Sequence, residues 1–201
     1  MNDTVILDGM GMASVAASDL TASANDNCSV ADTTLSQSNF TTADVGNNSI
    51  VVTVTDGSGN QSTCTANVFV IEPAPTAVCQ NATIQLDGAG NALVVPGDID
   101  NGSSDNCAIA GMFVNPAAFT CANIGANTVT LTVTDVNQNT SSCAADVTVL
   151  DTISPIAVCQ DITIQLDASG NAAIDATEID NGSNDACGIA NFYVDVSTFS
   201  C

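Results

Sequence analysis

The sequence predicts an all-β protein made of tandem immunoglobulin-like antiparallel β-sandwich domains, stapled by disulfides and arranged end to end as a rod. Three observations favour this class. The chain repeats itself, its apolar residues alternate with polar ones, and its cysteines recur at fixed places in the repeat. Alternation over short runs is typical of strands that are buried on one face.

The repeat is clearest between residues 77–107 and 157–187, which are offset by 80 positions and identical at 19 of 31. A weaker copy ends at Cys28, 79 positions before Cys107. We therefore expect a segment of a longer array, with linkers that contain proline and hold the domains semi-rigidly. The predicted domains are 1–72, which lacks its first strand, 73–152, which is complete, and 153–201, which lacks its last strands.

The strands are predicted from the alternation, at about seven per repeat and with no helix. Apolar residues on either side of the DGAGN turn predict a β-hairpin, with Ile84 and Leu86 before the turn and residues 92–95 after it. Short strands are expected at 112–114 and 192–194, and a longer strand over 127–134. A phenylalanine recurs two residues before the third cysteine position of each repeat, and we predict that it is buried in the core. The three phenylalanines are Phe40, Phe119 and Phe199.

The charge balance excludes several functions. The chain has 22 Asp and Glu and no Lys, Arg or His, so nucleic acid and anionic membranes would be repelled. No run approaches the roughly 18 apolar residues of a membrane span, so no direct membrane insertion is expected. Without His or Lys, the usual bases for a Ser or Cys nucleophile are missing. We predict that the protein is not an enzyme and has no catalytic residues.

Nine cysteines predict disulfides and an oxidising, extracellular location. The first repeat keeps Cys28 and Cys64 but has Thr42 in place of the third cysteine, and the position of its first cysteine would precede Met1. Two positions are lost together and two are kept together, which suggests that each set is a pair. The predicted pairs are Cys28–Cys64, Cys107–Cys143, Cys79–Cys121 and Cys159–Cys201, which leaves Cys187 alone.

An acidic loop in each repeat is the candidate metal site. Asp98, Asp100 and Asp105 crowd one loop, and Glu178, Asp180 and Asp185 crowd its counterpart. Hard oxygen ligands of this kind suit calcium, which is the candidate cofactor. The alternative is a solvated turn in which the same side chains accept hydrogen bonds from backbone N–H groups.

The motifs taken together resemble a known family. The order TVTD-x-x-x-N, cysteine, SPIAVCQ, ITIQLD, IDNGS-x-D-x-C is similar to the hyalin-type (HYR-like) repeats of large Bacteroidetes surface proteins. The resemblance implies export by type IX secretion and a place at the cell surface in an adhesin, stalk or filament, such as those used in gliding. Asp-Thr sequences also resemble an O-glycosylation motif of that phylum, at Thr4, Thr33 and Thr152.

The predicted function is a structural repeat segment of an extracellular filament or adhesin stalk, involved in surface attachment or gliding. Its partners would be neighbouring repeats or further copies in the filament. The alternative is an adhesive module that uses calcium to bind surface glycans or another partner. A third possibility, an ice- or mineral-facing surface, rests only on the outward threonines of residues 128–134, which are usual on an exposed strand.

Overall fold

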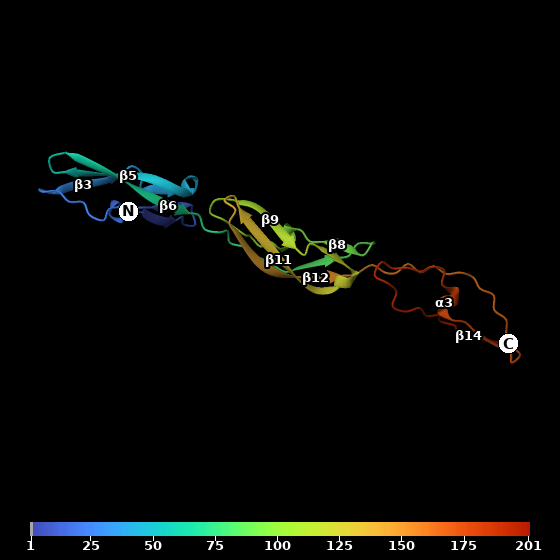
Figure 1. Ribbon diagram of the computed structural model, residues 1–201. Helices are drawn as coiled ribbons and strands as arrows, with labels where there is room; N and C mark the ends of the chain where they lie inside the picture. The colour runs from blue at the N-terminus through green and yellow to red at the C-terminus, as the bar shows by residue number, and fades with distance from the viewer. Residues whose placement is uncertain (1) are drawn as a thin grey trace. The chain divides into compact units, whose positions relative to one another are not determined.

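The protein, seen in a computed structural model that describes residues 2–201, is built mainly of β-strands (Figure 1). The chain divides into two compact units. One comprises Met1–Cys79, Asp100–Phe113 and Thr130–Cys143, and the other comprises Gln80–Ile99, Val114–Val129 and Ala144–Cys201. This division passes through the middle repeat, so the repeat boundaries at 72/73 and 152/153 stay a prediction. No helix among the described residues has the length and apolarity to cross a membrane.

The first repeat contains two sheets that enclose a core. The larger sheet has the strand order β1-β6-β5-β3 and the smaller one pairs β2 with β4. The strands are β1 (Asn2–Ile6), β2 (Met12–Ser14), β3 (Val30–Leu35), β4 (Asn39–Thr41), β5 (Gly46–Asp56) and β6 (Gln61–Ile71). Burial alternates along β5 and β6, as the period-two pattern predicts.

The second repeat has the same plan. Its larger sheet has the order β7-β12-β11-β9, and its smaller sheet pairs β8 with β10. The strands are β7 (Ala82–Gln85), β8 (Asn91–Leu93), β9 (Ile109–Asn115), β10 (Ala118–Thr120), β11 (Gly125–Asp135) and β12 (Thr140–Leu150). The strands predicted at 112–114 and 127–134 are thus confirmed as parts of β9 and β11. The first and second repeats each have six strands rather than seven.

The third repeat forms fewer strands. β13 (Asn171–Ala173) pairs with β14 (Thr198–Ser200), and isolated bridges join Ile156 to Asn184 and Cys159 to Asp180. The strand expected at 192–194 is absent from the described structure. In the second repeat, the equivalent β9 pairs with β11, and residues 153–201 contain no counterpart of β11.

The strand pairing differs from expectation in two details of the sandwich. In the first and second repeats, the first strand pairs in parallel with the last, as β1 does with β6 and β7 with β12. The residues around the DGAGN turn do not form a hairpin either. The turn itself closes, with the Asp87 N–H donating to the Asn91 carbonyl at 2.8 Å. However, β7 and β8 enter different sheets, because the chain crosses from one layer to the other at this turn.

The prediction of no helix was also wrong at the single-turn level. Short helices follow β2, β8 and β13, and in each of them an acidic side chain accepts a hydrogen bond from the backbone N–H three residues before it. They are α1 (Ala17–Leu20), α2 (Pro96–Ile99) and α3 (Ala176–Ile179), with the 3₁₀ turns η1 (Thr42–Asp44) and η2 (Cys121–Asn123). Leu20 and Ile99 bury the apolar side of the first two helices.

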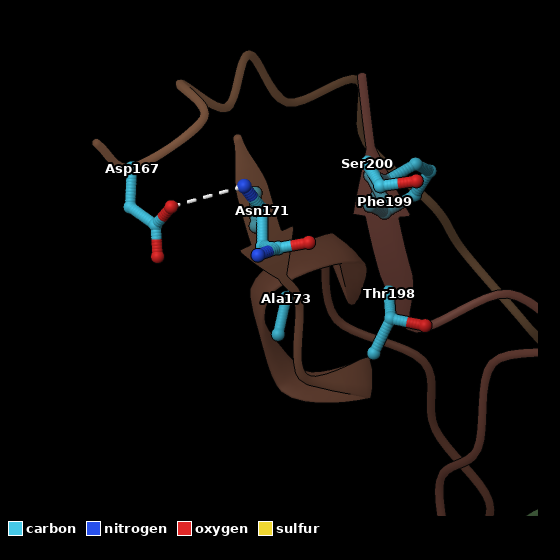
Figure 2. A pocket seen from close by; sticks show the side chains of 7 residues that line it. Asp167, Asn171, Ala173, Thr198, Phe199 and Ser200 are labelled. Carbon is cyan, nitrogen blue, oxygen red and sulfur yellow. Dashed lines mark hydrogen bonds between the residues drawn. The ribbon is translucent and has the colours of Figure 1, made fainter. Parts of the chain in front are cut away.

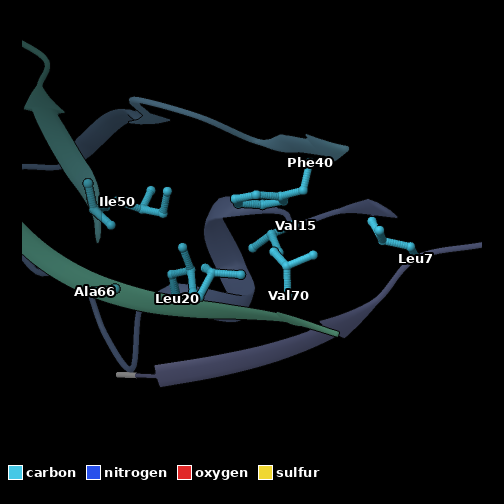
Figure 3. Close-up of a cluster of buried hydrophobic side chains, with 9 residues drawn as sticks. Leu7, Val15, Leu20, Phe40, Ile50, Ala66 and Val70 are labelled. Atoms are coloured by element: carbon cyan, nitrogen blue, oxygen red, sulfur yellow. The ribbon is translucent and has the colours of Figure 1, made fainter. Parts of the chain in front are cut away.

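The recurrent phenylalanine is confirmed as core in two repeats. Phe40 and Phe119 are each 1% exposed, and Figure 3 shows Phe40 packed with Val15 and Val70 between the layers of the first repeat. Phe199 is 38% exposed, which corrects the prediction for the third repeat. It pairs only across β13–β14, without the larger sheet that covers Phe119 in the second repeat.

The disulfides are Cys79–Cys143 and Cys121–Cys187. All four predicted pairs were wrong, since Cys28, Cys64, Cys107, Cys159 and Cys201 are free in the described structure. The parallel pairing of β7 with β12 explains the first bond. Ala82 lies opposite Val147, so Cys79, just before β7, comes beside Cys143 with the two Cα atoms 5.8 Å apart.

The second bond joins neighbouring repeats. The pairs were predicted wrongly because the argument assumed that two cysteines missing from the same repeat would be partners. Cys121 of the second repeat bonds to Cys187 of the third. Thr42 takes the place of Cys121 in the first repeat, and it is close enough to the free thiol of Cys107 in the second repeat for its side chain to act on the pKa of that thiol. A cysteine missing from one repeat therefore leaves its partner unpaired in the next repeat, not in the same one.

The burial of the two phenylalanines predicts different costs of truncation. Phe119→Ala should lower the free energy of unfolding by about 3–5 kcal/mol, because it removes a ring that is 1% exposed and leaves a cavity. The matched change Phe199→Ala should cost about 1 kcal/mol or less. Urea denaturation followed by circular dichroism measures both. Equal losses would contradict the assignment of Phe119, and not Phe199, to the core.

The position of Thr42 predicts a further disulfide. In Thr42→Cys, the new thiol should oxidise with Cys107, as Cys121 does with Cys187, and stabilise the chain by about 2–4 kcal/mol. Peptide mapping under non-reducing conditions detects the bond. The neighbouring exposed change Ala43→Cys is the control and should leave Cys107 free. A free thiol on Cys107 in the oxidised Thr42→Cys protein would show that the two positions do not meet.

Candidate metal centre

The residues predicted as calcium ligands in the second repeat each close a turn. The Asp98 carboxylate accepts a hydrogen bond from the Val95 N–H at 2.8 Å, at the start of α2. Asp100 accepts from the Ser103 N–H at 3.0 Å, and its hydrogen bonds, led by the Ser103 side chain, lower its pKa. Asp105 accepts from the N–H groups of Cys107 and Ala108, the two residues just before β9.

Their counterparts in the third repeat do the same work. Glu178 accepts from the Asp175 N–H at 2.8 Å, and Asp180 accepts from the Ser183 N–H at 3.0 Å. Asp185 accepts from the Cys187 N–H at 2.7 Å. The six side chains thus behave as the alternative prediction described: their carboxylates accept hydrogen bonds from the backbone N–H groups of turns.

The acids that do come together form a different group. Ligand atoms of Glu72, Asp105 and Cys107 all lie within 4.8 Å of one another. Asp135 is joined to Glu72 through the Asn139 side-chain amide, which donates to both carboxylates. We call Glu72, Asp105, Cys107 and Asp135 the Glu72 cluster. Within the part of the chain that the structure describes, neither Asp98 nor Asp100 belongs to such a group. The structure therefore brings only Asp105, of the three predicted ligands in this loop, to a candidate metal centre.

Three separate segments build the Glu72 cluster. Glu72 follows the last residue of β6, Asp105 and Cys107 lie in the loop before β9, and Asp135 ends β11. All belong to the same compact unit. The loop is tied to the β11–β12 turn because the Val136 N–H donates to the Ala108 carbonyl at 3.1 Å.

The β11–β12 turn fixes the position of Asp135. One of its carboxylate oxygens accepts hydrogen bonds from the N–H groups of Asn137 and Asn139, both at 2.8 Å. The Asn139 side-chain amide then donates to the other oxygen at 2.9 Å and also to a Glu72 carboxylate oxygen. A single amide thereby bridges two buried carboxylates, since Glu72 is 5% exposed and Asp135 is 0% exposed.

Burial and neighbouring charge act strongly on Glu72. Loss of water, followed by the neighbouring Asp135 carboxyl group and the charge of Asp105, raises the pKa of Glu72 to about 7. Burial opposes ionisation of Asp135 as well, but the hydrogen bonds from Asn139 and Asn137 hold its pKa below the ordinary value. Burial and the charges of Glu72 and Asp105 raise the pKa of the Cys107 thiol. One carboxylate is therefore held ionised and the other resists ionisation.

A related group recurs at the next linker. Ligand atoms of Asp151, Asp185 and Cys187 lie within 4.8 Å of one another, and these residues correspond to Glu72, Asp105 and Cys107. The sulfur of Cys187 is bonded to Cys121, so the carboxylates are the donors that the two groups share. No counterpart of Asp135 is present in residues 153–201.

Sequence analysis missed Glu72 and Asp135. Glu72 stands alone in a linker, and Asp135 belongs to a motif that looks like an ordinary hairpin turn. A signal was available in the recurrence of an acid just after the last strand, as Glu72 and then as Asp151.

The other predicted sites and hollows carry less chemistry. Thr4 and Thr152 are exposed and Thr33 is half-buried. A hollow beside β13 and β14 is lined by Asn171, Thr198 and Phe199 together with Asp167, but the Asp167 carboxylate is engaged by the Asn171 N–H at 3.0 Å (Figure 2). The hollow therefore marks the uncovered face of the third repeat and offers no free charged ligand.

Comparisons with known proteins show only distant similarity. No protein-family model matches the sequence, and no curated protein matches it. The solved fibronectin(III)-like modules of Clostridium thermocellum CbhA are 13% identical, with a TM-score of 0.28 over 64% of this chain and 83% of that one. Domains EC1-2 of human protocadherin-24 are 14% identical, with a TM-score of 0.33 over 75% of this chain and 95% of that one.

Protocadherin gamma B7 extracellular domains 1-4 give a TM-score of 0.31 at 12% identity, over 86% of this chain. The chain spans 55% of the length of that solved chain. At these scores the similarities carry no argument about function. The assignment to tandem immunoglobulin-like sandwiches rests on the strand order and burial described above.

The raised pKa of Glu72 predicts how stability depends on pH in the metal-free protein. The unfolded side chain has an ordinary pKa of 4.5 and the folded one a pKa of about 7, so folding takes up a proton between these values. The contribution of Glu72 to the free energy of unfolding should therefore be highest below pH 4.5. It should fall by on the order of 2 kcal/mol as pH rises to 7.

Urea denaturation in the presence of a chelator, repeated from pH 5 to 7.5, measures this slope. Glu72→Gln should remove it, because the amide does not ionise. Glu178→Gln, at an exposed helix cap, should keep the slope of the wild type. The lowered pKa of Asp135 acts at a lower pH than this window. A slope that persists in Glu72→Gln would show that another group titrates.

Proposed function

We propose that this protein is a structural repeat segment of an extracellular surface filament or adhesin stalk that carries tension along the chain. The observation that carries the proposal is the overlap of the two disulfide loops. One loop runs from Cys79 to Cys143 and the other from Cys121 to Cys187, so residues 121–143 belong to both. Disulfides of this kind persist in an oxidising environment outside the cell.

The overlap limits how far the chain can be stretched. Tension applied to the two ends crosses from Cys79 to Cys143, returns to Cys121 and crosses to Cys187. The stretched path then holds the 22 residues between positions 121 and 143 rather than the 108 between positions 79 and 187. At roughly 3.6 Å per residue, the oxidised segment extends to about 80 Å and the reduced segment to about 390 Å.

Composition and resemblance support the same function. The chain contains no Lys or Arg, so proteases of trypsin-like specificity have no site to cut, as suits an exposed polymer. The disulfide between Cys121 and Cys187 makes the neighbouring repeat a covalent partner. The similarity to hyalin-type repeats favours a place at the cell surface, with export by type IX secretion and a role in attachment or gliding as parts of the proposal.

Single-molecule stretching of the whole chain tests the proposal. Removing one bond, with Cys121→Ser and Cys187→Ser, leaves 44 residues in the stretched path and should add about 80 Å. Removing the other, with Cys79→Ser and Cys143→Ser, leaves 42 and should add nearly the same. Removing both should add about 310 Å, far more than the sum of the single effects.

This lack of additivity is the signature of overlapping loops. The matched control is Cys28→Ser with Cys64→Ser, which removes two free cysteines and should leave the extension unchanged. If reductant does not lengthen the wild-type chain, or if the two bonds lengthen it additively, the proposed tension path is wrong.

A further inference from the structure

The Glu72 cluster poses a problem of charge that the chain cannot solve by itself. Three carboxylates, those of Glu72, Asp105 and Asp135, interact closely, and two of them are shielded from water. Burying a charge is costly unless an opposite charge or hydrogen bonds compensate it. With no Lys, Arg or His in its sequence, the chain has no cationic side chain to place there.

One oxygen in the cluster has no hydrogen-bond partner among the described residues. Glu72 Oε1 is buried and has no hydrogen-bond partner, although Glu72 Oε2 accepts from Asn139. Carboxylate oxygens of Glu72 and Asp105 lie within 4.8 Å of each other. Buried polar atoms without a partner are rare in folded proteins, and an ion is one common explanation.

Asp105 offers a second available oxygen. Both backbone N–H groups that it caps, those of Cys107 and Ala108, donate to Oδ2, at 2.8 and 3.0 Å. Neither of these two N–H groups donates to the other carboxylate oxygen, Asp105 Oδ1. Asp135 adds an ionised carboxylate that Asn137 and Asn139 hold in place.

We propose that Glu72, Asp105 and Asp135 form a binding site for a calcium ion. This site differs from the loop site expected from the sequence, because Asp98 and Asp100 take no part in it and Glu72 and Asp135 replace them. It connects the linker after β6 with the loop before β9 and the β11–β12 turn. The proposal stands independently of the tension-bearing function, since the disulfides do not involve these three residues.

The donor set favours calcium over zinc. Calcium takes six to eight oxygen ligands at about 2.3–2.6 Å in flexible geometry, which carboxylates, carbonyls and water supply. Zinc prefers Cys and His ligands. Cys107 is the only soft donor in the cluster, and its equivalent in the next group, Cys187, has its sulfur in a disulfide. The oxygen donors are what the two groups have in common.

Calorimetric titration of the whole chain with calcium chloride, after removal of metal by a chelator and in 150 mM sodium chloride as a roughly physiological salt, tests the proposal. The wild type should show a saturable site. Glu72→Gln should weaken it by roughly tenfold or more, because it removes the unpartnered carboxylate. The control Asp146→Asn also removes one negative charge, from an exposed carboxylate on β12, and should keep the wild-type affinity.

Thermal unfolding supplies a second measurement that does not depend on weak heats. Without calcium, Glu72→Gln should unfold at the same temperature as the wild type or higher, because it removes a buried charge. With calcium, the wild type should gain stability and Glu72→Gln should not. A residue that only packs would instead lower the unfolding temperature equally in both conditions.

Several results would overturn the calcium site. One is that the wild type unfolds at the same temperature with calcium as with chelator. Another is that calcium raises the unfolding temperature of Glu72→Gln as much as that of the wild type. A third is that zinc chloride stabilises the wild type and calcium chloride does not. Loss of calcium binding in Glu178→Gln, with Glu72→Gln unaffected, would return the site to the acidic loop predicted from the sequence. None of these outcomes bears on the stretching experiment, so the two proposals fail separately.

Discussion

The absence of any cationic side chain constrains the rest of this structure. Carboxylates can be stabilised only by hydrogen bonds, by water or by ions from solution. Many turns use hydrogen bonds. In Asp56, Asp87 and Asp167, the side chain accepts hydrogen bonds from the backbone N–H groups two and four residues further on. The acids thereby form the turns, and the unusual composition is compatible with a well-ordered β-fold. Glu72 is the exception, because it is buried without enough donors.

The parallel pairing of the first and last strands organises the covalent structure. It brings the start of each repeat beside the end of the same repeat, so Cys79 meets Cys143. The second bond then reaches from the η2 turn of one repeat to the acidic loop of the next. Two bonds with these connections necessarily overlap in sequence. A resistance to stretching follows from connectivity alone and does not depend on the strength of any single domain.

Much of the fold could be predicted from local pattern. The alternation of Val129, Leu131 and Val133 placed their strand and its buried face correctly, and the recurrence of Phe40 and Phe119 marked the core. The cysteine pairs could not be predicted in this way. The argument assumed that partners share a repeat, whereas Cys121 bonds to the following repeat and Thr42 leaves Cys107 free. A count of cysteines contains no information about which strands run parallel.

The candidate metal site could likewise be predicted only in part from the sequence. Local sequence was sufficient to identify the acidic loops, the turns that they form and the all-β class, because hydrogen bonds to neighbours and a period of two residues act over short distances. Tertiary structure decided which acids meet. Glu72 and Asp135 are 63 positions apart in the sequence, and only the folding of linker, loop and turn together buries both of them beside Asp105. Burial depends on all surrounding segments at once, which is why these three acidic residues, which lie far apart in the sequence, meet only in the folded chain.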